Sequence, residues 1–140
     1  MSAASNTGSV DYINLEGLHQ NPAFSQAVVV TGAVKTVYIG GQNAVDATGE
    51  IVGTGDFQAQ SRQVLDNIQT CLAAAGAGFE HIVKLIILVV QGQPLYAGLA
   101  AFQEFFPAGA RPPAVTVAFV AGLAHPEFLV EIDAIAVVPA

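Results

Sequence analysis

The sequence has few charged side chains, and very few of them are positive. Charged residues make up 11% of the 140 residues, and only four are lysine or arginine, against eleven that are aspartate or glutamate. The formal net charge is −7. Proteins that bind nucleic acids usually carry a basic patch or stripe, and anionic membrane surfaces attract the same kind of charge. We therefore expect neither nucleic acid nor a membrane surface as a partner.

Cysteine and long apolar runs are also scarce. The single cysteine, Cys71, cannot form an internal disulfide, and its helical position beside Leu72 favours packing over a nucleophilic role. No apolar stretch reaches the roughly 18 residues that span a bilayer, because the longest candidate, Ile82–Val90, contains Lys84. The N-terminus lacks the basic start and apolar run of a secretion signal. These features predict a soluble, cytoplasmic protein.

The sequence also lacks a recognisable pattern for a metal or cofactor site. The three histidines are scattered without ligand spacing, and no glycine-rich stretch matches a phosphate-binding loop. We therefore expect no metal and no cofactor.

In contrast, hydrophobic residues make up 53% of the chain. A small domain with so few charges would leave much apolar surface in contact with water, which favours an oligomer.

The predicted elements follow the order of an α+β domain. The length predicts one domain, residues 10–140, after a flexible lead over residues 1–9. Turn chemistry at Thr31–Lys35 predicts a hairpin between its flanking strands, Asp56 is a plausible N-cap, and Pro107 ends the second helix. The pattern predicts a mixed six-stranded sheet with two helices on one face. The predicted strands are 10–15, 26–30, 36–39, 79–90, 114–121 and 128–138, and the helices are 57–75 and 95–106.

The last strand is apolar on both of its faces apart from two acids. Residues 130, 132, 134, 136 and 138 form a purely apolar row, whereas the alternate row contains Glu131 and Asp133. Two helices can cover only one face of a sheet, so the other face should meet copies of the same chain. Because acids are costly at such an interface unless they are paired, Glu131 and Asp133 mark either an intersubunit polar network or the wall of a cleft.

Arg111 is the most distinctive cation, because it stands directly before Pro112 and Pro113. Proline restricts the preceding residue to an extended backbone, and a planar guanidinium on a rigid segment suits the binding of a carboxylate or phosphate. The alternatives are a surface arginine at a strand entrance and a structural ion pair with Glu131 or Asp133.

The sequence contains a series of blocks that match a known family: Pro22-Ala-Phe-Ser-Gln-Ala-Val, Tyr38-Ile-Gly-Gly-Gln, Thr48-Gly-Glu, Gln60-Ser-Arg-Gln-Val-Leu-Asp-Asn-Ile, Ala73-Ala-Ala-Gly, Val83-Lys, Phe102–Phe106, Arg111-Pro and Val130-Glu-Ile-Asp-Ala-Ile-Ala-Val. The blocks cover about residues 20–138, and in their order the sequence resembles the RidA/YjgF family. The resemblance implies a chorismate-mutase-like fold and a homotrimer with sites in clefts between subunits. The place of Lys84 in the family pattern implies a salt bridge or hydrogen bonds to loop carbonyls.

The resemblance also implies an activity: hydrolysis of reactive enamine or imine intermediates, such as 2-aminoacrylate, to 2-keto acids and ammonia without a cofactor. Arg111 matches the arginine that binds the substrate carboxylate, and Glu131 matches the glutamate that positions water. Gly41 matches a glycine whose backbone lies against the ligand, and Phe24 stands where active members commonly have tyrosine. A small imino or keto acid is the implied ligand.

Three positions depart from the family pattern. Phe24 lacks a phenol hydroxyl, Leu99 stands where many members have asparagine, and Pro113 replaces a common cysteine. These changes make the implied pocket more apolar, and they leave open a non-catalytic member that binds a small carboxylate or another metabolite. The hairpin near Gly122–Glu127 is also longer than in compact deaminases. Ribonuclease activity is disfavoured because it would want a basic surface, and the chain has four basic residues in all. A chorismate-mutase-type reaction is disfavoured because it would need more than one cation near the ligand, and only Arg111 is clearly placed.

Overall fold

The computed structural model describes residues 7–140. Most of the expected N-terminal lead, residues 1–6, lies outside this range, and the first strand begins at Ser9. In chain order the elements are β1 (Ser9–Ile13), β2 (Ala27–Thr31), β3 (Val34–Gln42), α1 (Phe57–Ala74), the 3₁₀ turn η1 (Phe79–His81), β4 (Ile82–Val90), α2 (Leu95–Phe105), β5 (Ala114–Val120) and β6 (Val130–Pro139).

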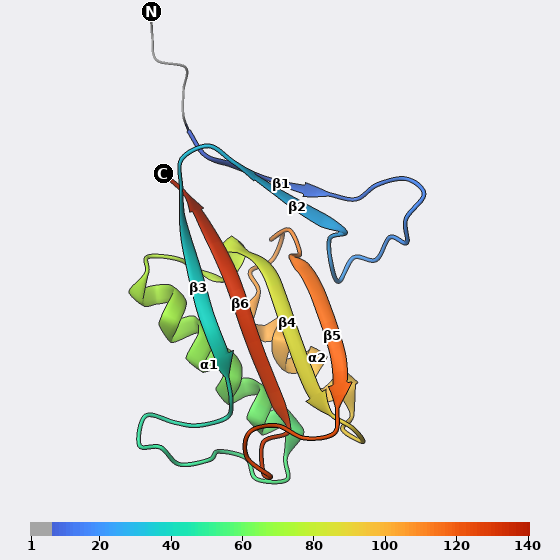
Figure 1. The fold of residues 1–140 in the computed structure, drawn as a ribbon, viewed down its shortest axis with the longest axis vertical. Coiled ribbons are helices and arrows are strands. Elements are labelled where there is room, and N and C mark those ends of the chain that lie inside the picture. The colour runs from blue at the N-terminus through green and yellow to red at the C-terminus, as the bar shows by residue number, and fades with distance from the viewer. Residues whose placement is uncertain (1–6) are drawn as a thin grey trace, which may run out of the picture.

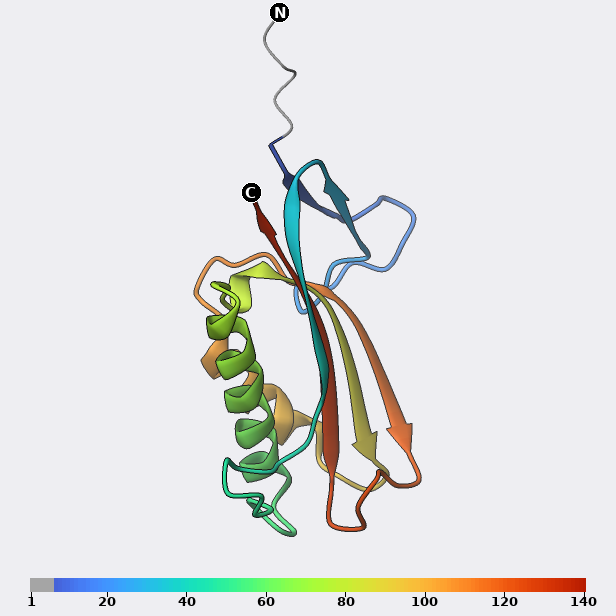
Figure 2. The ribbon, with the colours of Figure 1, turned by 60° about the vertical axis from the view of Figure 1, so that its left-hand side comes forward.

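A four-stranded mixed sheet is the centre of the fold, with the strand order β3-β6-β4-β5 (Figure 1). Strands β4 and β5 run parallel, whereas β6 is antiparallel to both of its neighbours. Both helices lie on the same side of this sheet (Figure 2). The α+β class and the placement of two helices on one face are therefore confirmed.

The six strands are divided between two sheets, which the sequence did not predict. β1 pairs with β2 in a separate antiparallel sheet, with Ser9 opposite Thr31 and Ile13 opposite Ala27. The predicted hairpin between β2 and β3 is therefore wrong, because β3 pairs with β6 instead. That pairing places Val37 and Ile39 of β3 beside small alanines on the helix-covered face, so burial of apolar side chains decides the partner rather than the local turn.

Helix α1 forms the core with strand β6, as the periodicity of both elements predicts. Asp56 caps the helix by accepting a hydrogen bond from the Ala59 backbone N–H at 3.0 Å. The apolar row of β6 is buried against the helix from Val130 to Ala136, whereas its last member, Val138, is half-buried. The alanines at positions 134 and 136 leave room for the helix to approach closely. The fully buried apolar side chains of α1 are Val64, Leu65, Ile68 and Leu72.

Helix α2 packs mainly against α1. Gly98 allows the close approach, since a Cβ atom at this position would lie 2.7 Å from the Phe57 ring. The C-terminal half of the helix is held by aromatic contacts, including Phe79 with Phe105 at 5.4 Å between ring centroids. The N-terminal half is more open than the periodicity predicted, with Leu95 39% and Leu99 42% exposed.

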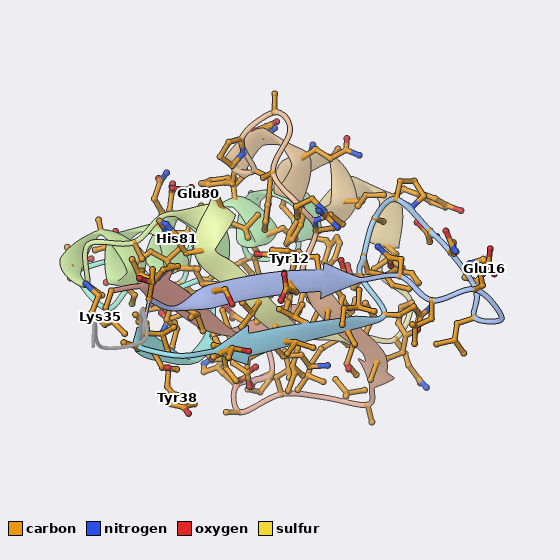
Figure 3. The ribbon with its side chains drawn as sticks, turned by 90° about the horizontal axis from the view of Figure 1, so that it is seen from above. Tyr12, Glu16, Lys35, Tyr38, Glu80 and His81 are labelled. Atoms are coloured by element: carbon orange, nitrogen blue, oxygen red, sulfur yellow. The ribbon has the colours of Figure 1, made fainter. Side chains whose placement is uncertain are left out.

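The other face of the sheet carries no helix (Figure 2). Ile86, Leu88 and Ile135 lie half-buried on it, and Tyr38 projects from β3 on this side with 78% of its surface exposed (Figure 3). The expectation that copies of the chain cover this face stays a prediction. Within residues 7–140, neither helix is long and apolar enough to cross a membrane.

Candidate functional site

Glu131 and Gly41 lie together on the face of the sheet that carries no helix. Glu131 is opposite Leu88 of β4, and a register shift between Ile39 and Gln42 brings the backbone of Gly41 against its side chain. A Cβ atom on residue 41 would lie 2.9 Å from Glu131 Oε2. Within the described residues this half-buried carboxylate makes no hydrogen bond or ion pair. The structure thus brings these two predicted residues together and leaves the carboxylate open to a ligand or water.

Gln60 of α1 holds the chain where it enters β6. This fully buried side chain donates to the carbonyls of Gly53, at 3.2 Å, and Glu127, at 2.8 Å. Its Oε1 accepts from the backbone N–H of Leu129 at 2.9 Å. Because Leu129 lies only two residues before Glu131, this network fixes the start of the strand that carries the carboxylate.

Arg111 lies just before β5 and is exposed. Its NH2 group donates to the backbone carbonyl of Tyr12 at 3.0 Å, and its Cζ atom lies 5.4 Å from the centre of the Tyr12 ring. Burial of Tyr12 on β1 raises its pKa, and the positive charge of Arg111 partly opposes that shift. The other guanidinium N–H groups make no hydrogen bond to a described residue, so they are available to a ligand.

The other three cations are already engaged. Lys35 donates to the carbonyl of Ala75 at the C-terminal end of α1, where a positive charge is favourable. The Arg62 guanidinium pairs with Glu104 at 2.9 Å. Lys84 donates to the Thr116 hydroxyl at 2.8 Å, instead of making the expected salt bridge or loop-carbonyl bonds. Arg111 is thus the cation in the described chain that is best placed to bind an anion.

Arg111 and Glu131 are not brought together within one chain. Along β4, Lys84 is opposite Ala114, the first residue of β5, whereas Leu88 is opposite Glu131. Arg111 precedes Ala114, so at least four residues of strand, about 13 Å, separate the two positions. Neither Glu131 nor Asp133 forms an ion pair with Arg111 in the described chain.

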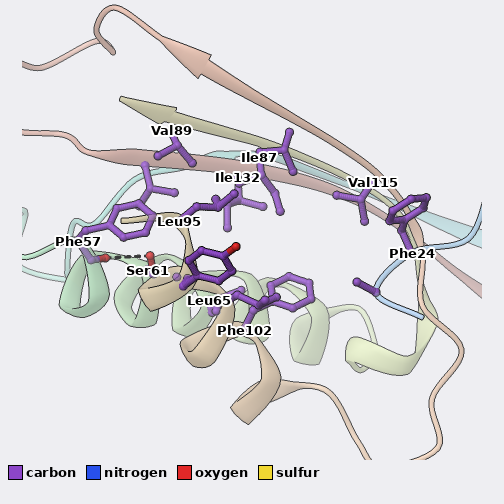
Figure 4. Close-up of a pocket in the computed structure, with 16 residues that line it drawn as sticks. Phe24, Phe57, Ser61, Leu65, Ile87, Val89, Leu95, Phe102, Val115 and Ile132 are labelled. Atoms are coloured by element: carbon purple, nitrogen blue, oxygen red, sulfur yellow. Dashed lines mark hydrogen bonds between the residues drawn. The ribbon is translucent and has the colours of Figure 1, made fainter. Parts of the chain in front are cut away.

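The three residues that depart from the family pattern lie away from the Glu131 carboxylate. Phe24 and Leu99 line an apolar pocket of about 190 Å³ beneath α2, on the helix-covered side of the sheet (Figure 4). Pro113 is fully buried and, with Leu99, lines a neighbouring hollow of about 270 Å³. Because Val130 and Ile132 line the first pocket, the alternating Glu131 between them faces away from it.

Two residues that sequence reasoning missed hold Arg111 in place. Tyr12 supplies the carbonyl and the ring described above. Ser25 is 2% exposed, donates from its hydroxyl to Pro112 O at 2.6 Å, and donates from its backbone N–H to Pro113 O at 2.9 Å. Ser25 belongs to the block that begins at Pro22, which could have signalled its role. Tyr12 lies outside every matching block and gave no such signal.

Two of the three histidines accept local hydrogen bonds. His81 Nδ1 accepts from the backbone N–H of Gly78 at 2.9 Å, and His125 Nδ1 accepts from that of Glu127 at 3.1 Å. Between residues 7 and 140, no group of three or more histidine, cysteine, aspartate or glutamate side chains could hold a metal ion.

Comparison with known proteins identifies the family. Residues 18–138 match the family model described as Endoribonuclease L-PSP. The chain belongs to the RidA/YjgF family. A curated member of it, the RutC family protein slr0709 of Synechocystis, is 35% identical over 117 residues, which cover 83% of this chain and 86% of the relative. The resemblance noted in the sequence is thereby confirmed.

Two solved RidA/YjgF structures have the same fold. The Rid-family protein YyfB of Yersinia pestis, described as of unknown function, superposes with a TM-score of 0.81 at 37% identity, covering 92% of this chain and 98% of its own. The YjgF gene product of E. coli gives a TM-score of 0.63 at 33% identity, covering 73% of this chain and 80% of its own.

Proposed function

We propose that this protein hydrolyses reactive 2-enamine and 2-imine intermediates, such as 2-aminoacrylate, to 2-keto acids and ammonia. The observation that carries the proposal is the free carboxylate of Glu131 against the backbone of Gly41. Arg111 supports it, because its remaining N–H groups can bind a substrate carboxylate in the bidentate geometry that guanidinium favours. The reaction needs little more, since an imine is already electrophilic and orientation supplies much of the acceleration.

The proposed steps follow from these two groups. The enamine first takes a proton from solvent at C3 and becomes the protonated imine, which is held through its carboxylate by Arg111. Glu131 accepts a proton from a water molecule as the water oxygen bonds to C2 and the C=N electron pair moves to nitrogen. The proton held by Glu131 then passes to the nitrogen of the resulting carbinolamine. The C–N bond breaks as the C=O bond re-forms, ammonia leaves, and the hydroxyl proton passes through Glu131 to solvent, which balances the proton taken up at C3.

We further infer that one substrate is bound between two protomers of a homotrimer. The separation of about 13 Å between Arg111 and Glu131 along β4 favours this arrangement, because a small imino acid cannot reach both within one chain. The half-buried apolar side chains on the face without a helix suit contact with further copies. Arg111 would then come from one protomer, and Glu131 with Gly41 from its neighbour.

A dehydratase-coupled assay tests the activity. The dehydratase generates 2-aminoacrylate from serine, and formation of the keto acid is followed with wild-type protein and with Arg111→Ala. We expect acceleration over the spontaneous rate with wild type and its loss in the variant. Acceleration that is equal in both would remove Arg111 from the proposed role. No acceleration by the folded wild type would refute the deaminase proposal.

Mixing two inactive variants tests the shared site. Arg111→Ala and Glu131→Gln chains are refolded together in equal amounts. About a quarter of the sites should then combine an intact Arg111 from one protomer with an intact Glu131 from its neighbour. The mixture should then regain about a quarter of wild-type activity, although each variant alone has almost none. No recovery in a well-assembled mixture would place both groups in one chain.

A second candidate function is non-catalytic binding of a small carboxylate. The observation that favours it is Phe24, which has no hydroxyl and lines an apolar pocket away from Glu131, so it supplies no proton-transfer group beside that carboxylate. Calorimetry with a 2-keto acid, read beside the coupled assay, separates the two functions. Ribonuclease action, which the family description names, is disfavoured because three of the four cations are already engaged.

A further inference from the structure

Helix α2 stands off the sheet and leaves the pocket of about 190 Å³ between itself and strands β4 and β5 (Figure 4). Contact with α1 sets its position, because Gly98 lies against Phe57 and Ser61. Apart from two hydroxyls, the lining side chains are apolar. The lining residues are Ala23, Phe24, Phe57, Ser61, Leu65, Ile87, Val89, Leu95, Tyr96, Gly98, Leu99, Phe102, Val115, Val117, Val130 and Ile132.

The pocket opens to solvent between the start of α2 and strand β5. Leu95, Tyr96 and Leu99 on the helix are 39%, 85% and 42% exposed, and Val117 on the strand is 44% exposed. The helix start has no side-chain cap, since Pro94 occupies the N-cap position. A small molecule can therefore reach the pocket without passing through the core.

The lining determines which chemistry the pocket accepts. It contains no aspartate, glutamate, lysine, arginine or histidine. The Ser61 hydroxyl already donates to the Phe57 carbonyl at 2.8 Å, which leaves Tyr96 to offer a hydrogen bond. An ionised ligand would lose its hydration here with no opposite charge to compensate, so a neutral ligand is favoured.

The volume and the aromatic lining of the pocket narrow the class of ligand further. An apolar protein cavity of about 150 Å³ lined by leucine, isoleucine and phenylalanine stays dry and binds benzene. This pocket is somewhat larger and presents the aromatic rings of Phe24, Phe57 and Phe102. Aromatic pairs gain energy beyond their buried area when they meet edge to face or offset. We propose that this pocket is a binding site for a neutral aromatic molecule of one or two fused rings.

This site is separate from the proposed carboxylate site. Its wall includes Val130 and Ile132, whereas Glu131 faces the opposite side of the same strand. Binding here requires neither Arg111 nor hydrolysis. Failure of the deaminase proposal would therefore leave this proposal standing, and the reverse also holds.

Indole is the probe for the experiment, because the chain contains no tryptophan and the indole emission can be followed without a tryptophan background from the protein. Titrating protein into indole should give a saturable blue shift of the emission as indole leaves water. The substitution Val117→Phe fills the mouth of the pocket and should lower the affinity by at least about tenfold. Val29→Phe on β2 is the matched control, because Val29 is similarly exposed, at 43%, and lies outside the lining, so it should bind indole as wild type does.

A second variant and a charged probe protect the conclusion if Val117→Phe folds poorly. Leu95→Asp places a carboxylate at the mouth and suits the first turn of a helix, so it should fold and bind indole more weakly. Indole-3-acetate, titrated into Arg111→Ala protein, should bind at least about tenfold more weakly than indole does because of its charge. The proposal is overturned if folded wild type gives no saturable shift, or if both pocket variants bind indole as tightly as the control.

Discussion

Replacing Gly41 with alanine tests whether the position of the Glu131 carboxylate governs activity. The new Cβ atom would lie 2.9 Å from Oε2, 3.0 Å from Cδ and 3.2 Å from Cγ of Glu131. These distances are too short for van der Waals contact, so one of the two groups must move. The glutamate is the one that moves, because it is a flexible side chain on a face without a helix, whereas residue 41 is fixed within strand β3.

The cost to folding should be small. The backbone at Gly41 does not have a positive φ angle, so alanine is not strained there, and the Gly→Ala change alone favours folding by about 0.4–1 kcal/mol. Forcing Glu131 away from its preferred rotamer costs about 0.5–1.5 kcal/mol. These effects nearly cancel, and we expect an unfolding free energy within about 1 kcal/mol of wild type. Displacing a reacting group by about 1 Å, however, should lower kcat by about a hundredfold.

The assay is keto-acid formation from enzymatically generated 2-aminoacrylate, read beside urea unfolding of the same preparations. Gly40→Ala is the matched control, because a Cβ atom at residue 40 meets nothing within 4 Å. We expect the control to keep wild-type activity and Gly41→Ala to lose it at nearly unchanged stability. Wild-type activity in Gly41→Ala would refute the role of the Glu131 position. Equal losses in both variants would assign the effect to the strand and not to the contact.

Three further predictions concern stability. Gly98→Ala should lower the unfolding free energy by about 1–3 kcal/mol in urea titrations, because the Phe57 ring must move; wild-type stability would contradict the close contact of the helices. Gln60→Met should lower it by about 3 kcal/mol, since three backbone groups lose their buried partner; a loss below about 0.5 kcal/mol would mean that water replaces the side chain. The hydrogen bond from the Thr48 hydroxyl, followed by those from the backbone N–H groups of residues 50 and 48, lowers the pKa of Asp46 in the folded protein. The contribution of the Asp46 carboxylate to stability is therefore complete above its unfolded-state pKa and lost in acid. The stability difference between wild type and Asp46→Asn should be present at pH 7 and shrink below about pH 4. An unchanged difference at pH 2 would contradict this.

The core could be predicted because its signals are local. The spacing of apolar residues in α1 and their alternation in β6 each determine which face is buried, whatever the partner strand. The pairing of β1 with β2 could not be predicted in this way. The turn at Thr31–Lys35 shows that the chain changes direction there, but it does not say which strand lies alongside, and the long apolar strand β6 took the place beside β3.

The candidate site was predictable in its residue types but not in its geometry. Arg111, Glu131 and Gly41 were all named from the sequence, and the contact between Glu131 and Gly41 agrees with that grouping. The separation of Arg111 from Glu131 depends on the registers of β5 and β6 along β4, which follow from tertiary packing. The support from Tyr12 was also hidden, because a hydrogen bond to its backbone carbonyl leaves no trace in residue identity.

The β1–β2 sheet has a consequence for how the protein responds to heat. Within residues 7–140 its strands pair only with each other, yet Tyr12 on β1 and Ser25, just before β2, both hold the segment that carries Arg111. Units with few pairing partners open at lower free energy than the core does, so this pair of strands can detach while α1 and β6 remain folded. Warming would then release the guanidinium before the protein melts, and amide hydrogens of β1 and β2 would exchange ahead of those in β6. Carboxylate affinity would fall with temperature well below the melting transition of the domain.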